Sequence, residues 1–506
     1  MTDRSTTPSI PSFASLDDML RALDGIARID GDTVAVLDEA GFRAGLIDRL
    51  VVAAVFADDP VRSVSRWLIR AAAPALGAFP ASIDPLYRAA GRGEYAHATA
   101  PAINVRGLTY DVMRTIFRAA HANDCKIFLL ELARSEMGYT EQRPGEYAAN
   151  ALAAAIKEGH RGPVFIQGDH YQINAKAYAK DAAAELAAVR DLTLEAIEAG
   201  YFNIDIDAST IVDLSLPTIE DQQALNARHT AEMTRIIRDH QPAGIAVSVG
   251  GEIGEVGGRN STVEDLRGFM MRYQAELQQQ GNEAGRDLEG LSKISVQTGT
   301  SHGGVVLPDG SIAQVAVDFD TLARLSEVAR EEYGMGGAVQ HGASTLPETY
   351  FHRFAEANAI EVHLATGFQN RIFDNPAFPA DLRNEIYAYL DAKHANERKP
   401  EMTDTQFHYT TRKRAWGPFK AAFWSLPAAT RQRLMDDLEP VFGLIMQRLG
   451  VANTGALVDR IVTRVDVPAP APAALRAALR GEQVAVAAGG DAAAADGRSG
   501  AGLRLD

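Results

Sequence analysis

The middle of the chain alternates between short apolar runs rich in β-branched residues and longer stretches with apolar residues at helical spacing. This alternation is typical of β–α units that build a parallel sheet. The predicted strands are PAINV (101–105), KIFLLEL (126–132), VFIQGD (164–169), FNIDID (202–207), IAVSVGGEI (245–253), ISVQTG (294–299), AVQHG (338–342) and EVHLAT (361–366). Helices are predicted at 109–122, 144–159, 176–199, 219–240, 262–281, 318–333 and 346–358. Eight units in about 280 residues favour an α/β fold of the (β/α)8 TIM-barrel type over an open sheet.

The two ends of the chain depart from this pattern. Residues 1–14 are rich in Ser, Thr and Pro, and we expect them to be disordered. Residues 15–94 have helical periodicity throughout, with Ser15 at the position of an N-cap, and predict a helical extension. The barrel with C-terminal helices is expected over 95–450, and 451–506 is expected to be a C-terminal segment ending in a disordered, low-complexity tail from about Val467.

Composition narrows the choice of partners and of metal ligands. Lys and Arg number 50 and Asp and Glu 66, and this net charge of −16 argues against nucleic acid as the main partner. The sequence has neither an apolar run long enough to span a membrane nor the apolar core of a signal peptide, so we expect a cytoplasmic protein. The single cysteine, Cys125, excludes an intrachain disulfide and a cysteine-based zinc site, so a metal would need histidines and carboxylates.

Histidines and carboxylates gather at the ends of the predicted strands. His170 follows the third strand, Glu252 ends the fifth, His302 follows the sixth and His341 ends the seventh. In a barrel these strand ends meet at one rim, where active sites are built. Three imidazoles and an open position suit a catalytic divalent metal, whereas the alternative is a set of unrelated core or surface histidines. Their positions at successive strand ends favour the metal.

Two further features lie near these histidines. Asp169 directly precedes His170, and it can either transfer a proton or orient the neighbouring imidazole. Glycine-rich turns follow the last three strands, in SHGGV, HGAST and ATGFQN. Backbone N–H groups in such turns can bind phosphate, with Ser344 and Thr366 as additional hydroxyl donors. The sequence therefore predicts an anion site beside the metal site.

Five ordered motifs resemble one enzyme family. GPVFIQGDH, NIDIDAS, GGEIGEVGG, VQTGTSHGG and VQHGASTLPE are similar to motifs of the class II (zinc-dependent) fructose-bisphosphate aldolases and their tagatose-bisphosphate relatives. The resemblance covers residues 95–375, with a weaker match in YTTRKRAW (409–416), and marks the chain as a long, divergent member. It implies an aldehyde-lyase of carbohydrate metabolism, such as glycolysis, that cleaves or forms a ketose (bis)phosphate through a zinc-stabilised enediolate of dihydroxyacetone phosphate or a similar donor.

The resemblance also implies roles for individual residues. His170, His302 and His341 would hold Zn²⁺ or another divalent metal, and Glu252 would become a ligand when the metal shifts. Asp169 would transfer the proton at the reacting hydroxyl, and Asp207 would lie near the metal. The implied substrate-binding residues are Asn104, Ser135, Gly303, Gly342, Ser344, His363, Thr366, Arg412 and Arg414. Arg412 or Arg414 would bind a distal phosphate, here or across the interface of a homodimer or larger homo-oligomer, although TRKRAWGPFK also suits a solvated helix start.

Two departures from the family pattern bear on the reaction. Arg259 and Asn260 stand where the family has an acidic loop residue, and Glu255, Glu264 or Asp265 are the candidate replacements. The eighth strand has His363-Leu364-Ala365-Thr366 where the family has N-x-D-T. These departures argue against fructose bisphosphate itself as the substrate. Besides an aldolase for another ketose phosphate, we therefore keep two alternatives: a zinc-dependent barrel epimerase or isomerase on a related sugar, and a non-catalytic sugar-phosphate-binding paralogue.

Overall fold

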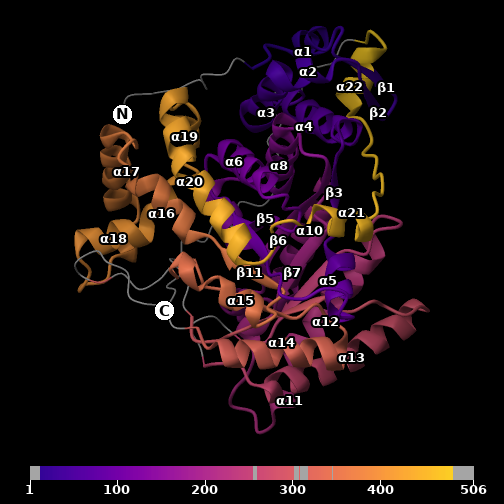
Figure 1. Ribbon diagram of the computed structural model, residues 1–506, viewed down its shortest axis with the longest axis vertical. Coiled ribbons are helices and arrows are strands. Elements are labelled where there is room, and N and C mark those ends of the chain that lie inside the picture. Colours follow the sequence, from indigo (N-terminus) through magenta and orange to yellow (C-terminus); the bar gives the residue numbers. More distant parts are fainter. Residues whose placement is uncertain (1–11, 255–258, 301–306, 308–316, 345, 483–506) are drawn as a thin grey trace.

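The computed structural model describes residues 12–254, 259–300, 307, 317–344 and 346–482 (Figure 1). At its centre, eight parallel strands form a closed barrel, which confirms the predicted fold class. The strands are β4 (Ala100–Asn104), β5 (Leu129–Ala133), β6 (Gly162–Gln172), β7 (Asn203–Asp207), β8 (Ser248–Glu252), β9 (Lys293–Val296), β10 (Ala338–Gln340) and β11 (Glu361–Leu364). Each strand pairs with the next, and β11 pairs with β4 to close the ring.

The register brings the functional strand ends to one rim. Ala133 at the end of β5 pairs with Asp169 in β6, and Glu252 at the end of β8 pairs with Ser295 in β9. The strands are buried along their whole length, apart from single intermediate positions near the end of β6. Buried parallel strands are usually apolar, so the charged residues that they carry near this rim require polar partners.

The helices that alternate with the strands surround the barrel. They are α6 (Thr109–Ala122), α7 (Arg134–Thr140), α8 (Pro144–Glu158), α9 (Ala175–Lys180), α10 (Ala182–Ala199), α11 (Ile219–Gln222), α12 (Ala224–His240), α13 (Val263–Ala284), α14 (Phe319–Tyr333), α15 (His352–Glu356) and α16 (Thr366–Asp374). The sequence analysis missed α7, and its helix at 346–358 is too long, because a short 3-10 turn (Glu348–Tyr350) precedes α15. The predicted helix at 176–199 is broken at Asp181, whose carboxylate accepts from the Ala184 N–H and caps α10.

The N-terminal segment is largely helical, as predicted, but it also contains three short strands that the sequence analysis did not predict. It comprises α1 (Leu16–Ala22), β1 (Ala27–Asp30), β2 (Thr33–Val36), α2 (Glu39–Gly41), α3 (Ile47–Phe56), α4 (Val61–Ala72), β3 (Ala78–Ala81) and α5 (Asp84–Gly91), with a π-helical turn at Phe42–Leu46 and a 3-10 turn at Pro74–Leu76. The predicted cap is present, since the Ser15 hydroxyl accepts from the Asp18 N–H. β3 pairs with β6 as a ninth strand. Four residues are too few to specify a strand locally, so the pairing partner decides this element.

The C-terminal part forms a further group of helices, and its last described residues, 462–482, form a segment that we call the strap. The elements are α17 (Ala380–Lys393), α18 (Asp404–Thr411), α19 (Lys420–Trp424), α20 (Ala428–Arg448), α21 (Gly455–Ile461) and α22 (Ala473–Leu479), with 3-10 turns at Ala395–Glu397 and Arg412–Ala415. Figure 1 draws α22 beside β1 and β2 of the N-terminal segment. No helix in the described ranges is long and apolar enough to cross a membrane.

Within the two ends for which disorder was predicted, the structure describes residues 12–14 and 467–482, and some of these residues make specific contacts. Phe13 is buried beneath the Arg49 guanidinium. At the other end, the Trp67 indole N–H donates to the Ala469 carbonyl at 2.8 Å, and Leu475 is fully buried. These contacts supply the apolar burial that the low-complexity composition does not reveal. Residues 1–11 and 483–506, for which disorder was also predicted, lie outside the described residues.

Candidate functional site

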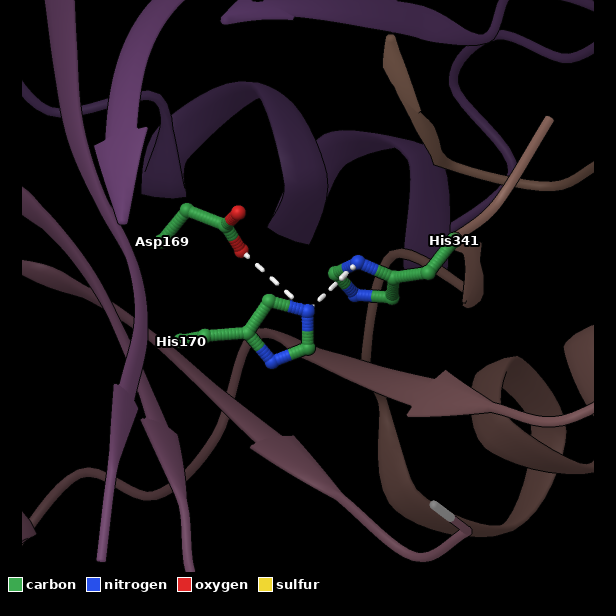
Figure 2. Close-up of side chains that lie close together, drawn as sticks. All are labelled: Asp169, His170 and His341. Carbon is green, nitrogen blue, oxygen red and sulfur yellow. Dashed lines mark hydrogen bonds and ion pairs between the residues drawn. The ribbon is translucent and has the colours of Figure 1, made fainter. Parts of the chain in front are cut away.

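His170 occupies an unusual backbone position at the end of β6. Its φ is +40°, in the left-handed region that non-glycine residues rarely adopt, and the pairing of β6 with β7 shifts register between Gly168 and Tyr171. Such a conformation costs about 1–3 kcal/mol and persists where the surrounding structure enforces it. The irregularity allows Asp169 and His170, which are neighbours on one strand, to approach the same point, whereas regular strand neighbours face opposite sides (Figure 2).

The two described histidines of the predicted metal set converge from opposite sides of the barrel. His170 Nε2 lies 3.0 Å from His341 Nδ1 (Figure 2). The other nitrogen of each ring faces an oxygen: His170 Nδ1 is 3.1 Å from Asp207 Oδ2, and His341 Nε2 is 3.0 Å from Ser295 Oγ. An ionised carboxylate only accepts, so His170 Nδ1 carries a proton, and in the metal-free protein the protonated ring can also donate through Nε2 to His341 Nδ1.

This arrangement fits a metal ion. When the Nε2–H of His341 donates to Ser295, its Nδ1 lone pair faces His170 Nε2, and a cation bound between the two nitrogens would take the place of the proton that they otherwise share. Metal-bound histidines commonly donate their second N–H to a carboxylate or a neutral oxygen in this way. Asp169 Oδ1 lies 3.8 Å from His170 Nε2, so Asp169, His170 and His341 present three donor atoms to one position.

Glu252 lies on the opposite side of the His170 ring. Its Oε2 is 3.1 Å from His170 Nδ1, the nitrogen that also faces Asp207. His170, Asp207 and Glu252 therefore form a second group of atoms close enough to share an ion. This placement is compatible with the predicted role of Glu252 as a ligand for a shifted metal, and that role stays a prediction.

Burial and charge act in opposite directions on the pKa values of these groups. Burial alone would lower the pKa of His170, but Asp169 and Glu252 outweigh it and raise the pKa well above its ordinary value. Burial would raise the pKa of Asp169, but His170 and His363 hold it well below its usual range. Burial and the nearby Asp207 raise the pKa of Glu252 to about 7. Asp169 is thus kept ionised, as a proton acceptor must be.

Several predicted residues lie outside the described part of the chain or are engaged elsewhere. His302, Gly303 and Glu255 fall in segments that the structure does not describe. The Asp265 carboxylate accepts from the Arg259 guanidinium at 2.6 and 2.7 Å and from the Thr262 N–H at the start of α13. Asp265 therefore has a structural role, which argues against it as the replacement for the loop acid.

The predicted substrate-binding residues of β4, α7 and β10 lie on the same rim. Asn104 ends β4 and donates through Nδ2 to Glu136 at 2.5 Å, while its buried Oδ1 has no hydrogen-bond partner among the described residues. Ser135 is exposed in the first turn of α7. Gly342, directly after His341, has φ of +73°, a conformation that suits glycine and lets the backbone turn closely.

The predicted phosphate turn joins the ends of β10 and β11. Ser344 Oγ accepts from the Ala365 N–H at 2.8 Å, and Thr366 is the first residue of α16. The turn therefore leads into the N-terminus of a helix, where free N–H groups favour an anion. His363, three residues earlier in β11, packs its ring on His341 with 4.0 Å between the centroids.

The arginines predicted for a distal phosphate differ in their surroundings. Arg412 is buried, and its guanidinium donates to Asp374 at 2.6 and 2.9 Å and to Asn370 at 2.7 Å. These bonds give Arg412 a structural role. Arg414 is half-buried, lies 3.3 Å from Glu397 and covers the Tyr139 ring.

The sequence analysis missed Lys413, which lies between these two arginines in the chain. Within the described ranges its ammonium has neither an ion pair nor a hydrogen bond. Burial and the nearby Arg106 and Arg414 lower its pKa to about 8. The position was visible in the sequence only as one cation of a basic run, with nothing to separate it from its neighbours.

The charged and polar residues inside the barrel were also missed. Glu131, Gln167, Lys293 and Glu361 are buried in β5, β6, β9 and β11, below the site. A charged side chain within or directly before an apolar strand was the available signal. Strand periodicity alone does not show whether such a residue points into a barrel or outward.

A family model described as fructose-bisphosphate aldolase class-II matches residues 81–412. No curated protein matches the chain.

Three solved structures are similar to this chain. The glycerol-complexed fructuronate-tagaturonate epimerase of Cohnella laeviribosi is 12% identical, with a TM-score of 0.51 over 85% of this chain and 90% of that one. A probable tagatose 6 phosphate kinase of Sinorhizobium meliloti is 18% identical, with a TM-score of 0.49 over 72% and 93%. A fructose-bisphosphate aldolase of Campylobacter jejuni is 16% identical, with a TM-score of 0.43 over 74% and 97%. At these identities the likenesses concern the fold alone.

Proposed function

The chain belongs to the class-II fructose-bisphosphate aldolase family, and from this premise we propose that it is a metal-dependent aldehyde-lyase that cleaves and forms a ketose phosphate. One observation carries the proposal: His170 Nε2 and His341 Nδ1 converge to 3.0 Å while the second nitrogen of each ring faces an oxygen. His302, which lies outside the described residues, would complete a set of three imidazoles. A divalent cation such as Zn²⁺ held there supplies Lewis acidity to a substrate carbonyl.

Asp169 is the proposed proton acceptor. During cleavage, the hydroxyl that becomes the aldehyde loses its proton to Asp169, and the electrons of the breaking C–C bond move toward the donor carbonyl. The carboxylate suits this step because His170 and His363 keep it ionised. In the condensation direction the same group returns the proton to the new hydroxyl. Asn104, whose buried Oδ1 has no hydrogen-bond partner among the described residues, would accept from a substrate hydroxyl.

Two anion sites are proposed for the ends of the substrate. Gly342, Ser344 and Thr366 would bind the phosphate of the donor half, near the N-terminus of α16. Lys413 and Arg414 would bind an acidic group at the distal end, since the Lys413 ammonium makes neither an ion pair nor a hydrogen bond within the described residues. A cation held near other cations gains most from binding an anion.

Epimerisation is the second candidate reaction. The expected loop acid is replaced by Arg259 and Asn260, and the eighth strand carries His363 in place of the family's Asn. These replacements alter the groups around the reacting carbons while leaving the metal histidines in place. The similar Cohnella laeviribosi protein is a fructuronate-tagaturonate epimerase, so acidic ketoses belong in any substrate screen.

The test is metal analysis of the purified protein together with NMR product analysis in D₂O. Ketose phosphates and ketouronates are incubated with the protein, with and without chelator. Cleavage to two carbonyl products supports the lyase, and deuterium incorporation without cleavage supports the epimerase. Binding with neither reaction leaves the non-catalytic paralogue.

His341→Ala provides the critical variant, and His240→Ala is its control because His240 is exposed on α12. We expect His341→Ala to lose both metal and turnover, and His240→Ala to keep them. Full metal content and full retro-aldol activity in His341→Ala would refute the proposed site.

A further inference from the structure

A column of buried polar side chains runs through the barrel beneath the site. Its lower part centres on Lys293 of β9, whose ammonium donates to Gln167 Oε1 at 2.7 Å, Asp205 Oδ2 at 3.0 Å and Glu361 Oε1 at 2.7 Å. The other Glu361 oxygen accepts from the Tyr87 hydroxyl. Tyr87 belongs to α5, so the base of the column is anchored in the segment that precedes the barrel.

The upper part of the column leads to the proposed proton acceptor. His363 Nε2 lies 2.6 Å from Glu361 Oε1. The opposite ring nitrogen, Nδ1, lies 2.9 Å from Glu131 Oε2 and 3.3 Å from Asp169 Oδ1. Asp169 Oδ1 is therefore located between two imidazoles, His363 below and His170 at 3.8 Å on the metal side.

Stability alone does not account for this arrangement. The interiors of such barrels are usually filled with layers of branched apolar side chains. Burying an ion pair costs desolvation energy that its attraction often fails to recover, and apolar replacements are frequently at least as stable. Here the column holds the carboxylates of Glu131, Asp169, Asp205 and Glu361 beside Lys293 and His363. Three hydrogen bonds fix the Lys293 ammonium, and the His363 ring nitrogens lie 2.6–3.3 Å from three carboxylates, so the close packing of opposite charges gives each side chain a defined place.

We propose that Lys293, Glu361 and His363 are positioning residues for the Asp169 carboxylate, with Tyr87 as their anchor. The inference rests on the proposed role of Asp169. His363 sets which way the Asp169 carboxylate is turned, Glu361 holds the His363 ring, and Lys293 holds Glu361. The column thereby connects the N-terminal segment to the site through residues that lie below the rim and do not touch the substrate.

Tyr87→Phe is the least disruptive variant, because it removes one hydroxyl at the far end of the column. Tyr201→Phe is the matched control: Tyr201 is also fully buried, and its hydroxyl has no hydrogen-bond partner in the described ranges. We expect Tyr87→Phe to lower kcat about fivefold with KM unchanged, and Tyr201→Phe to leave both unchanged.

A second pair of variants separates positioning from structural support. Lys293→Met leaves Glu361 and Asp205 without their cation and is expected to lower stability and kcat together. Lys293→Met combined with Glu361→Gln removes one charge of each sign and is expected to recover much of the stability. If the column only supports the fold, kcat recovers with stability; if it positions Asp169, kcat stays low.

A spectroscopic readout keeps this test independent of the proposed reaction. The d–d absorption of Co²⁺ bound at His170 and His341 responds to the placement of the adjacent Asp169 carboxylate. We expect the Co²⁺ spectrum to change in Tyr87→Phe and Lys293→Met but not in Tyr201→Phe. If the wild-type protein shows no turnover, the proposed lyase activity is refuted. The spectral comparison still tests whether the column positions Asp169. Unchanged spectra together with unchanged kcat in both column variants would overturn the inference.

Discussion

Substitution of Asp207 tests how the site holds a metal, because each oxygen of the Asp207 carboxylate has two hydrogen-bonding partners. Oδ2 faces His170 Nδ1 at 3.1 Å and accepts from Gln172 Nε2 at 2.7 Å. Oδ1 accepts from the backbone N–H and the hydroxyl of Ser209, at 3.0 and 2.7 Å. All four donors point at the buried Asp207 carboxylate. The hydrogen bond from His170 Nδ1 holds the His170 ring so that its Nε2 faces His341.

Asp207→Asn keeps the shape but cannot keep this pattern. In one orientation the new NH₂ faces the N–H groups of His170 and Gln172, and in the other it faces the N–H of Ser209. Either way a buried donor meets donors, at a cost of about 1–3 kcal/mol in stability. Loss of the carboxylate behind a metal-binding histidine typically weakens metal affinity about 10–100-fold, or about 1.4–2.8 kcal/mol.

The assay is competition for Zn²⁺ against a chromophoric chelator at pH 7, with urea unfolding of the same samples. Asp213→Asn is the matched control, because Asp213 makes the same turn to Ser215, through its N–H at 3.0 Å and its hydroxyl at 2.6 Å, without touching a histidine. We expect the control to bind metal within about twofold of wild type. Wild-type affinity in Asp207→Asn would refute the orienting role, and equal weakening in both variants would assign the effect to charge alone.

Three further predictions follow from other parts of the structure. Burial lowers the pKa of His160 to about 4. As the pH falls from 6.5 toward 4, the unfolded chain binds a proton at this histidine that the folded chain excludes, so the folded state loses about 3 kcal/mol of stability. Urea unfolding across this pH range should show a smaller loss of stability in His160→Gln than in wild type. Leu475→Ala should cost about 2–5 kcal/mol, because the side chain is fully buried in α22, whereas a disordered tail would lose nothing in the same unfolding measurement. Lys413→Ala should raise KM for an anionic substrate about tenfold with stability unchanged, while Arg412→Ala should lower Tm and leave KM unchanged, and the reverse outcome would reassign the two cations.

The strands that carry the site were predictable because their information is local. Runs such as VFIQGD and FNIDID are apolar and β-branched, and turn or helix signals bound them, so their number, order and parallel direction follow from the alternation with helices. Once the strands are parallel, their ends share one rim. That geometry predicts the proximity of His170 and His341, which the structure places 3.0 Å apart although 171 positions separate them in the chain.

Elements whose stability comes from distant partners could not be predicted in this way. β3 exists because β6 offers it an edge, and the strap through Ala469 and Leu475 is ordered by the N-terminal segment that it crosses. The composition of a segment describes its own residues, but it does not show which pairing or packing partners the rest of the fold provides. The same limit applies to Arg412, which looks like a phosphate ligand in the sequence until Asp374 and Asn370 are seen to occupy its guanidinium.

The sequence by itself determined the fold class and the set of histidines and carboxylates available at the rim, because hydrophobic periodicity and strand polarity are properties of the chain. Only the tertiary structure decided how those groups are used. It turned His170 inward through a left-handed backbone and placed Glu252 on the opposite side of its ring from His341. It also joined Lys293 and Glu361 beneath Asp169. These outcomes depend on packing between strands far apart in sequence, and the energies of buried charges are set by such neighbours.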